Sequence, residues 1–218
     1  MLRQALIFDL DGTLIDTRRD IVIAVNEMRR FYHLPLLAED VIAGYVGDGV
    51  KKLVERAIQG TAVDLEEALV VQRRLYRAHL FDTSTLYPGV EAGLRTLHHR
   101  GHSLSVVTNK LLEFTESLLV HFNVRDLFQV VIGDGNAPTL KPHPAGILET
   151  LRLTGTPPEA AWVIGDHHTD LESGRRAGVL RIFVTWGIGH PGTETPDARV
   201  NSFEELVQRF PFGQLHGS

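Results

Sequence analysis

The sequence predicts an α/β protein in which an all-helical domain is inserted into a doubly wound parallel sheet. Five short, almost continuously apolar runs end in polar residues or glycine and alternate with helical patterns. This is the pattern of strands that helices cover on both faces. One long segment after the first run has helical spacing only, which indicates a separate helical unit.

The first strand is expected at "ALIFD" (5–9), and the helical unit follows it. Apolar residues recur with helical spacing over 21–32, 50–58 and 65–80, and residues 16–85 contain no convincing strand. We therefore expect a helical domain at 16–85, and a core domain formed by residues 1–15 together with 86–218.

The α/β pattern resumes at "YPG" (87–89), before a helix over 90–100 that Gly101 ends. A long loop rich in glycine and proline spans 186–199. The other expected elements are strands at 104–109, 129–134, 161–166 and 181–187, a short strand at 199–201 and a helix over 203–210. Together they predict a Rossmann-like core.

The composition gives no reason to expect binding to nucleic acid or to a membrane. The 218 residues carry a formal net charge of -5 and a pI near 6.1, so a small molecule is the better expectation. The absence of cysteine excludes disulfides and thiolate chemistry. The first apolar run is too short for a signal peptide and no run could span a membrane, so we expect a cytoplasmic protein. The oligomeric state stays open between monomer and homodimer.

Reactive side chains follow the predicted strands at the edge where doubly wound sheets bind ligands. They are Asp9 and Asp11 after the first strand, Thr108 and Asn109 at the end of the second, Lys141 in "TLKPHP", and Asp166 with Asp170 after "AWVI". Carboxylates crowded into one crevice repel one another unless a cation is bound, and oxygen ligands select a hard ion. The pattern therefore predicts an Mg2+ site.

These residue types suit phosphoryl transfer. Asp9 can attack phosphorus to give an aspartyl phosphate. Asp11 can act as an acid toward the leaving oxygen and then as a base toward water. The transferred group also needs fixed donors and positive charge. The candidates are Lys141, Thr108, Asn109 and the backbone amides near Gly12 and Thr13.

Each motif alone also has a structural explanation. An Asp-Gly pair is common in turns, and Asp166 and Asp170 could stabilise the start of the next helix. Lys141 could be a solvated loop lysine, and Thr108 could cap a helix. The histidines at 98–99 and 167–168 are adjacent pairs without the spacing of two ligands on one helix face, so we expect surface or supporting roles for them.

In combination, the motifs resemble the haloacid dehalogenase-like hydrolase superfamily. Its four ordered motifs correspond to "DLDGT" (9–13), Thr108 of "VVTN", Lys141 of "KPHP" and "GDHHTD" (165–170). The resemblance extends over essentially the whole chain and implies that residues 16–85 form a helical cap. The second aspartate of "DLDGT" points to the phosphatases of the superfamily, because the dehalogenase branch lacks that acid.

The resemblance also implies a role for each residue of these motifs. Asp9 would be the nucleophile and Asp11 the general acid/base, while Lys141 and Thr108 would hold the phosphoryl group. The implied reaction is the hydrolysis of a phosphate monoester through an aspartyl phosphate.

For the metal, the resemblance implies that Asp9, Asp166 and the main-chain carbonyl of Asp11 bind Mg2+, with Asp170 supporting the site. One departure concerns His167, where many phosphatase relatives have serine. This difference affects the hydrogen bonds expected around the metal.

The segment "YVGDGVKKLVERAI" (45–58) is similar to the cap segment of phosphoglycolate phosphatases, which implies 2-phosphoglycolate as the substrate. Gly47, Asp48 and Gly49 are candidate substrate contacts or a plain turn between helices, and the helix from Val50 would point its amino end at an anion. The alternatives are a phosphatase for a sugar phosphate, a nucleotide or pyrophosphate, a sugar phosphomutase, or a non-enzymatic phosphoaspartate switch.

Overall fold

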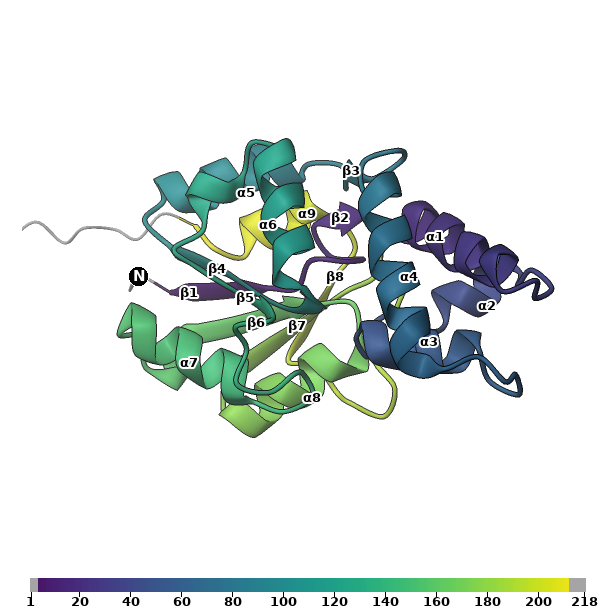
Figure 1. Cartoon of the computed structure of the whole chain (residues 1–218). Coiled ribbons are helices and arrows are strands. Elements are labelled where there is room, and N and C mark those ends of the chain that lie inside the picture. The colour runs from purple at the N-terminus through teal and green to yellow at the C-terminus, as the bar shows by residue number, and fades with distance from the viewer. Residues whose placement is uncertain (1–3, 212–218) are drawn as a thin grey trace, which may run out of the picture.

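The computed structural model describes residues 4–211 and contains a six-stranded parallel sheet of order β5-β4-β1-β6-β7-β8 (Figure 1). Residues 1–3 and 212–218, part of the expected core domain, lie outside the described residues. The strands are β1 (Ala5–Phe8), β4 (Ser103–Leu111), β5 (Val130–Asp134), β6 (Ala161–Gly165), β7 (Leu180–Val184) and β8 (Ala198–Val200). The predicted fold class is confirmed, because every neighbouring pair in this sheet is parallel.

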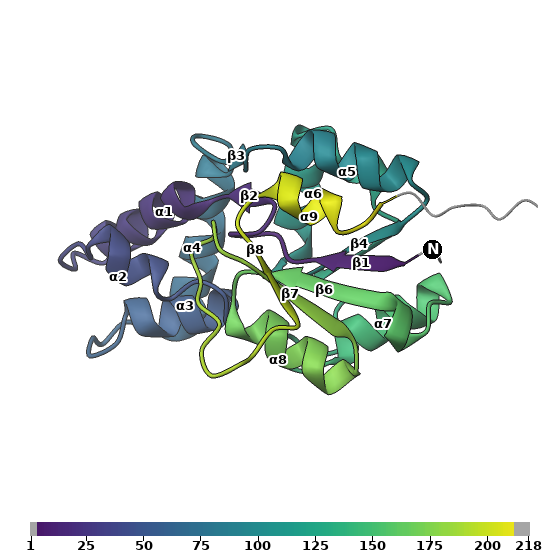
Figure 2. The same ribbon diagram turned by 180° about the vertical axis from the view of Figure 1, so that it is seen from behind.

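Helices cover both faces of the sheet (Figures 1 and 2). One face carries α5 (Val90–His99), α6 (Leu112–His121) and α9 (Phe203–Gln208), and the other carries α7 (Ala145–Thr154) and α8 (His168–Ala177). Single 3-10 turns, η1 (Arg125–Leu127) and η2 (Pro158–Ala160), precede β5 and β6. Along β1, Leu6 and Phe8 pack into one hydrophobic cluster and Ala5 and Ile7 into the other. This two-sided burial is why the strand reads as a continuous apolar run.

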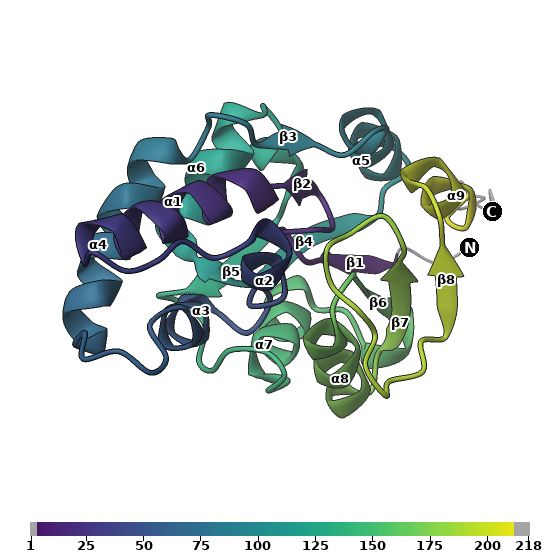
Figure 3. The ribbon, with the colours of Figure 1, turned by 90° about the vertical axis from the view of Figure 1, so that its right-hand side faces the viewer.

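The helical insert contains α1 (Arg18–Phe31), α2 (Glu39–Ala43), α3 (Val50–Ala57) and α4 (Leu65–His79), which lie beyond one end of the sheet (Figure 1) and face the viewer in Figure 3. It is joined to the core through β2 (Ile15–Asp16) and β3 (Thr85–Leu86), which pair antiparallel. Sequence analysis predicted neither these strands nor α2, because elements of two to five residues are too short to show a periodic pattern. The division into domains at these crossings stays our proposal.

Asp20 links the two chain segments that connect the insert to the core. Its buried carboxylate accepts hydrogen bonds from the amide and hydroxyl of Thr83, at 2.9 and 2.6 Å, and from those of Ser84, at 2.9 and 2.7 Å. Because four donors satisfy this charge, the start of α1 is held against the segment that returns to the core.

Two strand ends differ from the predicted ranges by more than one residue. β4 continues beyond Asn109 to Leu111, with a register shift against β5 between Val107 and Leu111. β7 ends at Val184 rather than at residue 187. The extension of β4 places Lys110 on a strand end beside the site described below.

None of the helices within residues 4–211 has the length and apolar character needed to cross a lipid bilayer.

Candidate active site

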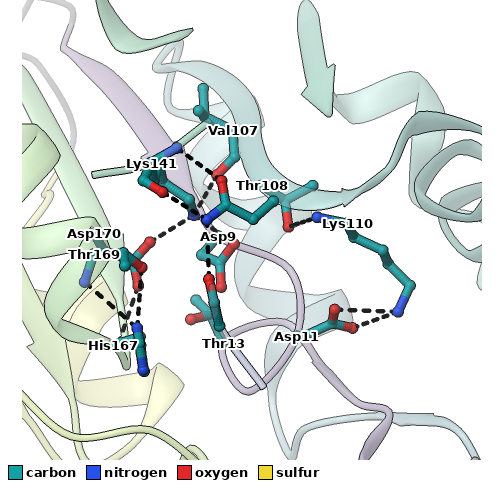
Figure 4. A network of polar contacts seen from close by, with 12 residues as sticks. Asp9, Asp11, Thr13, Val107, Thr108, Lys110, Lys141, His167, Thr169 and Asp170 are labelled. Carbon is teal, nitrogen blue, oxygen red and sulfur yellow. Dashed lines mark hydrogen bonds and ion pairs between the residues drawn. The ribbon is translucent and has the colours of Figure 1, made fainter. Parts of the chain in front are cut away.

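The predicted site residues of the core gather at the carboxyl ends of β1, β4 and β6. These strands are neighbours, with β1 between the other two, so the residues that follow them face the same crevice. The Asp9 amide donates to the Ile164 carbonyl at 2.9 Å, which continues the ladder between β1 and β6 for one residue. Figure 4 shows the resulting network.

Lys141 connects two of the aspartates. Its Nζ donates to Asp9 Oδ1 at 2.7 Å, to Asp170 Oδ1 at 2.6 Å and to the Val107 carbonyl at 2.8 Å. All three ammonium hydrogens are therefore used. Burial alone would lower the pKa of Lys141, but Asp170 and Asp9 raise it, so the lysine stays charged. A solvated loop lysine is excluded, because the side chain is 4% exposed.

Asp166 lies beside this group, and no cationic side chain among residues 4–211 forms an ion pair with it. Its Oδ1 accepts from the Thr13 hydroxyl at 3.2 Å, and its Oδ2 accepts from the amides of Ile188 and Gly189 at 2.9 and 2.8 Å. Burial, followed by the charge of Asp9, raises the pKa of Asp166 to about 7. Burial also raises the pKa of Asp9 to about 6, although Lys141 opposes the shift.

This carboxylate set fits a hard divalent cation. Asp9, Asp166 and Asp170 are all buried and can each offer an oxygen within 4.8 Å of the others. Lys141 supplies only one positive charge for the three carboxylates. A Cβ on Gly12, whose φ is +82°, would lie 2.2 Å from Asp166 Oδ2. The glycine therefore allows the loop after β1 to approach the carboxylate, which no side chain at that position would permit.

Asp11 turns away from Asp9. Lys110 Nζ donates to its two carboxylate oxygens at 2.9 and 3.1 Å, and the Thr17 hydroxyl donates to Oδ1 at 2.6 Å. In Figure 4 the Asp11 and Lys110 side chains meet on the far side of the loop from Lys141. The predicted metal contact of Asp11 concerned its main-chain carbonyl, so this orientation of the carboxylate does not bear on it.

Lys110 is the functional candidate that sequence analysis missed. It follows "VVTN" directly, but its partners are Asp11 and, through a 2.6 Å hydrogen bond, the Tyr76 hydroxyl of α4. Position in the motif was the available signal. No local pattern reveals a partner on a helix of the insert.

The two polar residues at the end of β4 have different surroundings. Thr108 is buried, borders the cavity, and accepts a hydrogen bond from the Lys110 amide at 3.3 Å. Asn109 Nδ2 donates to the carbonyls of Lys141 and Gly47, both at 2.9 Å, and its Oδ1 accepts from the Lys141 amide at 2.8 Å. Asn109 therefore holds the Lys141 loop and the insert together, and its contact with a phosphate stays a prediction.

The segment Gly47, Asp48 and Gly49 packs onto the core beside His167. A Cβ on Gly47 would lie 2.7 Å from the His167 ring, and both glycines have positive φ. Asp48 forms an ion pair with Arg56 at 2.5 Å. The amino end of α3 borders the cavity through Gly49 and Val50, and its contact with an anion stays a prediction.

His167 has a structural role that explains how the chain accommodates it in place of serine. Its side chain accepts from the Thr169 amide, while Asp170 Oδ2 accepts from the His167 amide at 3.0 Å, so the two residues form a capping box for α8. Burial lowers the pKa of His167 to about 4. The structure also brings His190 against this adjacent pair, with ring centroids 5.6 Å from His167 and 5.8 Å from His168.

A cavity of about 80 Å³ lies between the core and the insert. The core contributes polar residues to it, and the insert contributes mainly apolar ones. Its lining includes Asp9, Asp11, Lys110 and Asp166 from the core, and Val46 and Leu53 from the insert.

Comparison with known proteins shows the family of this chain. The chain belongs to the haloacid dehalogenase-like hydrolase family, whose model matches residues 6–184, and the resemblance drawn from the four motifs is thereby confirmed. It is similar to the phosphoglycolate phosphatase of Chromobacterium violaceum, with 36% identity over 93% of this chain and 94% of that protein. Against the phosphoglycolate phosphatase of Aquifex aeolicus the identity is 32%, over 94% and 95% of the two chains.

Among solved structures, the chain is similar to that of a protein from Haemophilus somnus described as a predicted phosphoglycolate phosphatase. The TM-score is 0.87 and the identity 26%, over 95% of this chain and 97% of that one. A predicted phosphatase from Clostridium acetobutylicum gives a TM-score of 0.81 and 26% identity, over 96% and 98%.

Proposed function

We propose that the protein is an Mg2+-dependent phosphomonoester hydrolase that acts through an aspartyl phosphate, with 2-phosphoglycolate as its substrate. The observation that carries this proposal is the convergence of Asp9, Asp166 and Lys141 in one buried crevice, with Asp11 beside it. Family membership and the named phosphoglycolate phosphatases support it.

In the first half of the reaction, an Asp9 carboxylate oxygen attacks phosphorus. The ester P–O bond breaks, and the leaving oxygen takes a proton from the Asp11 carboxyl group. Lys141 orients the nucleophile through its 2.7 Å contact with Oδ1. The Thr108 hydroxyl and the backbone near Gly12 and Thr13 would hold the transferred oxygens.

In the second half, water attacks the phosphorus of the phosphoaspartate. The water gives a proton to Asp11, the bond between Asp9 and phosphorus breaks, and inorganic phosphate leaves. The two halves together restore both carboxyl groups to their starting states.

Asp9, Asp166 and the Asp11 carbonyl would hold Mg2+. Asp170 supports the site by binding Lys141 and the His167 amide. Bound Mg2+ would neutralise the crowded carboxylates and the charge on the transferred group.

The size of the cavity favours a small ester. A volume of about 80 Å³ is well below the roughly 300–1,000 Å³ of clefts that hold drug-sized ligands. Phosphoglycolate adds only a methylene and a carboxylate to the phosphate, whereas a nucleotide or a sugar phosphate is much larger. The amino end of α3 at this cavity adds backbone donors suited to an anion.

The test is a panel of phosphate esters assayed with Mg2+ and with chelator, for the wild type and for Asp9→Asn. We expect 2-phosphoglycolate to give the highest kcat/KM, chelator to remove activity, and Asp9→Asn to lower kcat by about 10³-fold or more, because the amide is a poor nucleophile. Asp126→Asn, at an exposed position outside the site, is the matched control. Undiminished turnover by Asp9→Asn would reject the assigned nucleophile.

A further inference from the structure

Lys110 places a desolvated positive charge beside the acid of the proposed reaction. Its side chain is 5% exposed, and Nζ contacts both Asp11 oxygens and the Tyr76 hydroxyl while lying 4.5 Å from the centroid of the Tyr76 ring. The Asp11 carboxylate is therefore the counter-ion of this buried ammonium group.

Few other cationic side chains border the cavity. Among the described residues that line it, only Arg73 and Lys110 are lysine or arginine. Arg73 pairs with Glu113 at 2.7 Å, and its side chain is 54% exposed. Lys141 is not among the residues that line the cavity, and it binds Asp9 and Asp170. Among the described residues, Lys110 is thus the buried lysine that borders the space next to a phosphate at Asp9.

The observed contacts conflict with the role of Asp11. Both of its carboxylate oxygens are bound to Lys110, and Thr17 binds one of them as well. In this orientation the side chain points toward Lys110 (Figure 4), so both oxygens are already engaged before a substrate binds. An anion that replaced Asp11 on Lys110 would free the carboxyl group to turn toward the substrate.

We propose that Lys110 binds the carboxylate of the substrate, and that this exchange releases Asp11 toward the leaving oxygen. The inference rests on the proposed function and names a specificity-determining residue for it. A carboxylate has the charge and planar geometry of the group it displaces, so the ammonium keeps a counter-charge throughout. The substrate class is phosphate esters with a carboxylate on the carbon next to the ester oxygen, which places the two anions close enough to share this cavity.

The test compares 2-phosphoglycolate with 2-hydroxyethyl phosphate, which has nearly the same size and lacks the carboxylate. The measurement is the ratio of kcat/KM for the two esters, with p-nitrophenyl phosphate as a substrate whose leaving group needs little acid assistance. We expect the wild type to prefer 2-phosphoglycolate. Lys110→Met should lower the ratio by at least about tenfold, because it removes one charge-assisted contact with the carboxylate. Hydrolysis of p-nitrophenyl phosphate should fall much less.

Two further variants separate this role from a structural one. Lys110→Arg keeps the charge on a side chain of different geometry and should retain part of the preference for 2-phosphoglycolate. The ratio of kcat/KM values can therefore still be measured if Lys110→Met does not fold. Lys52→Met removes an exposed lysine of α3 that does not line the cavity and should leave the ratio unchanged. Thermal unfolding of each variant measures stability separately.

Three results would overturn the inference. They are equal kcat/KM values for the two esters in the wild type, an unchanged ratio in Lys110→Met, and an equal fall for all three esters in that variant. The second and third leave the proposed function intact, because the wild type still prefers 2-phosphoglycolate. The first also removes 2-phosphoglycolate as the preferred substrate, but leaves the phosphatase activity and its catalytic residues in place. A wild type that hydrolyses none of the esters with Mg2+ present rejects the proposed function itself.

Discussion

Asp166→Asn should stabilise the metal-free protein while removing its response to Mg2+. Asp166 is 1% exposed, and burial raises its pKa from 3.8 to about 7. Between these values the folded state binds more protons than the unfolded state, so stability falls as pH rises from about 4 through about 7. At about 1.4 kcal/mol per pH unit, the ionised carboxylate lowers the free energy of unfolding by on the order of 4 kcal/mol above about pH 7.

Asparagine does not titrate, and its side-chain oxygen can still accept from the amides of Ile188 and Gly189. The melting temperature should be measured in chelator and in millimolar Mg2+, at about pH 4 and about pH 8. For a chain of this size 1 kcal/mol corresponds to about 2–4 °C. We expect Asp166→Asn to raise Tm by on the order of 10 °C at about pH 8 in chelator, and by little at about pH 4.

Mg2+ should raise the Tm of the wild type at about pH 8, because it binds only the folded state, and leave that of Asp166→Asn nearly unchanged. Asp126→Asn, an exposed replacement outside the site, should behave as the wild type does. If metal-free Asp166→Asn is no more stable than the wild type at about pH 8, the ionised carboxylate does not destabilise the metal-free protein, and the reasoning is wrong.

Two further predictions concern the backbone around the site. Gly12→Ala should abolish the Tm response to Mg2+ and lower kcat strongly, because the new Cβ would lie 2.2 Å from Asp166 Oδ2. The control is Gly60→Ala, which also has positive φ but has open space around it. It should lose about 1 kcal/mol of stability and keep the Tm response to Mg2+. Asn109→Ala removes hydrogen bonds to both the amide and the carbonyl of Lys141 and should lower kcat/KM by about tenfold or more. Steady-state kinetics at equal Mg2+ test it, and unchanged kcat/KM would contradict that positioning role.

The sheet and the set of residues at its edge could be predicted from the amino-acid pattern. Near-continuous apolar runs such as "AWVI" (161–164) can be buried only between two helical layers, and parallel strands place their carboxyl ends at one edge. Once the strands were located, the meeting of Asp9 with Asp166 followed from topology. The order of the four motifs then indicated the family, which the comparisons confirm.

The partners of these side chains could not be predicted and became visible in the folded chain. It paired Asp11 with Lys110 and Tyr76, and it seated Gly47 of the insert on His167. Such contacts join residues far apart in the chain, and no periodicity or local turn pattern encodes them. The direction of a polar side chain depends on which charged or hydrogen-bonding groups the packed elements bring within reach, and that is settled only when the insert closes on the core.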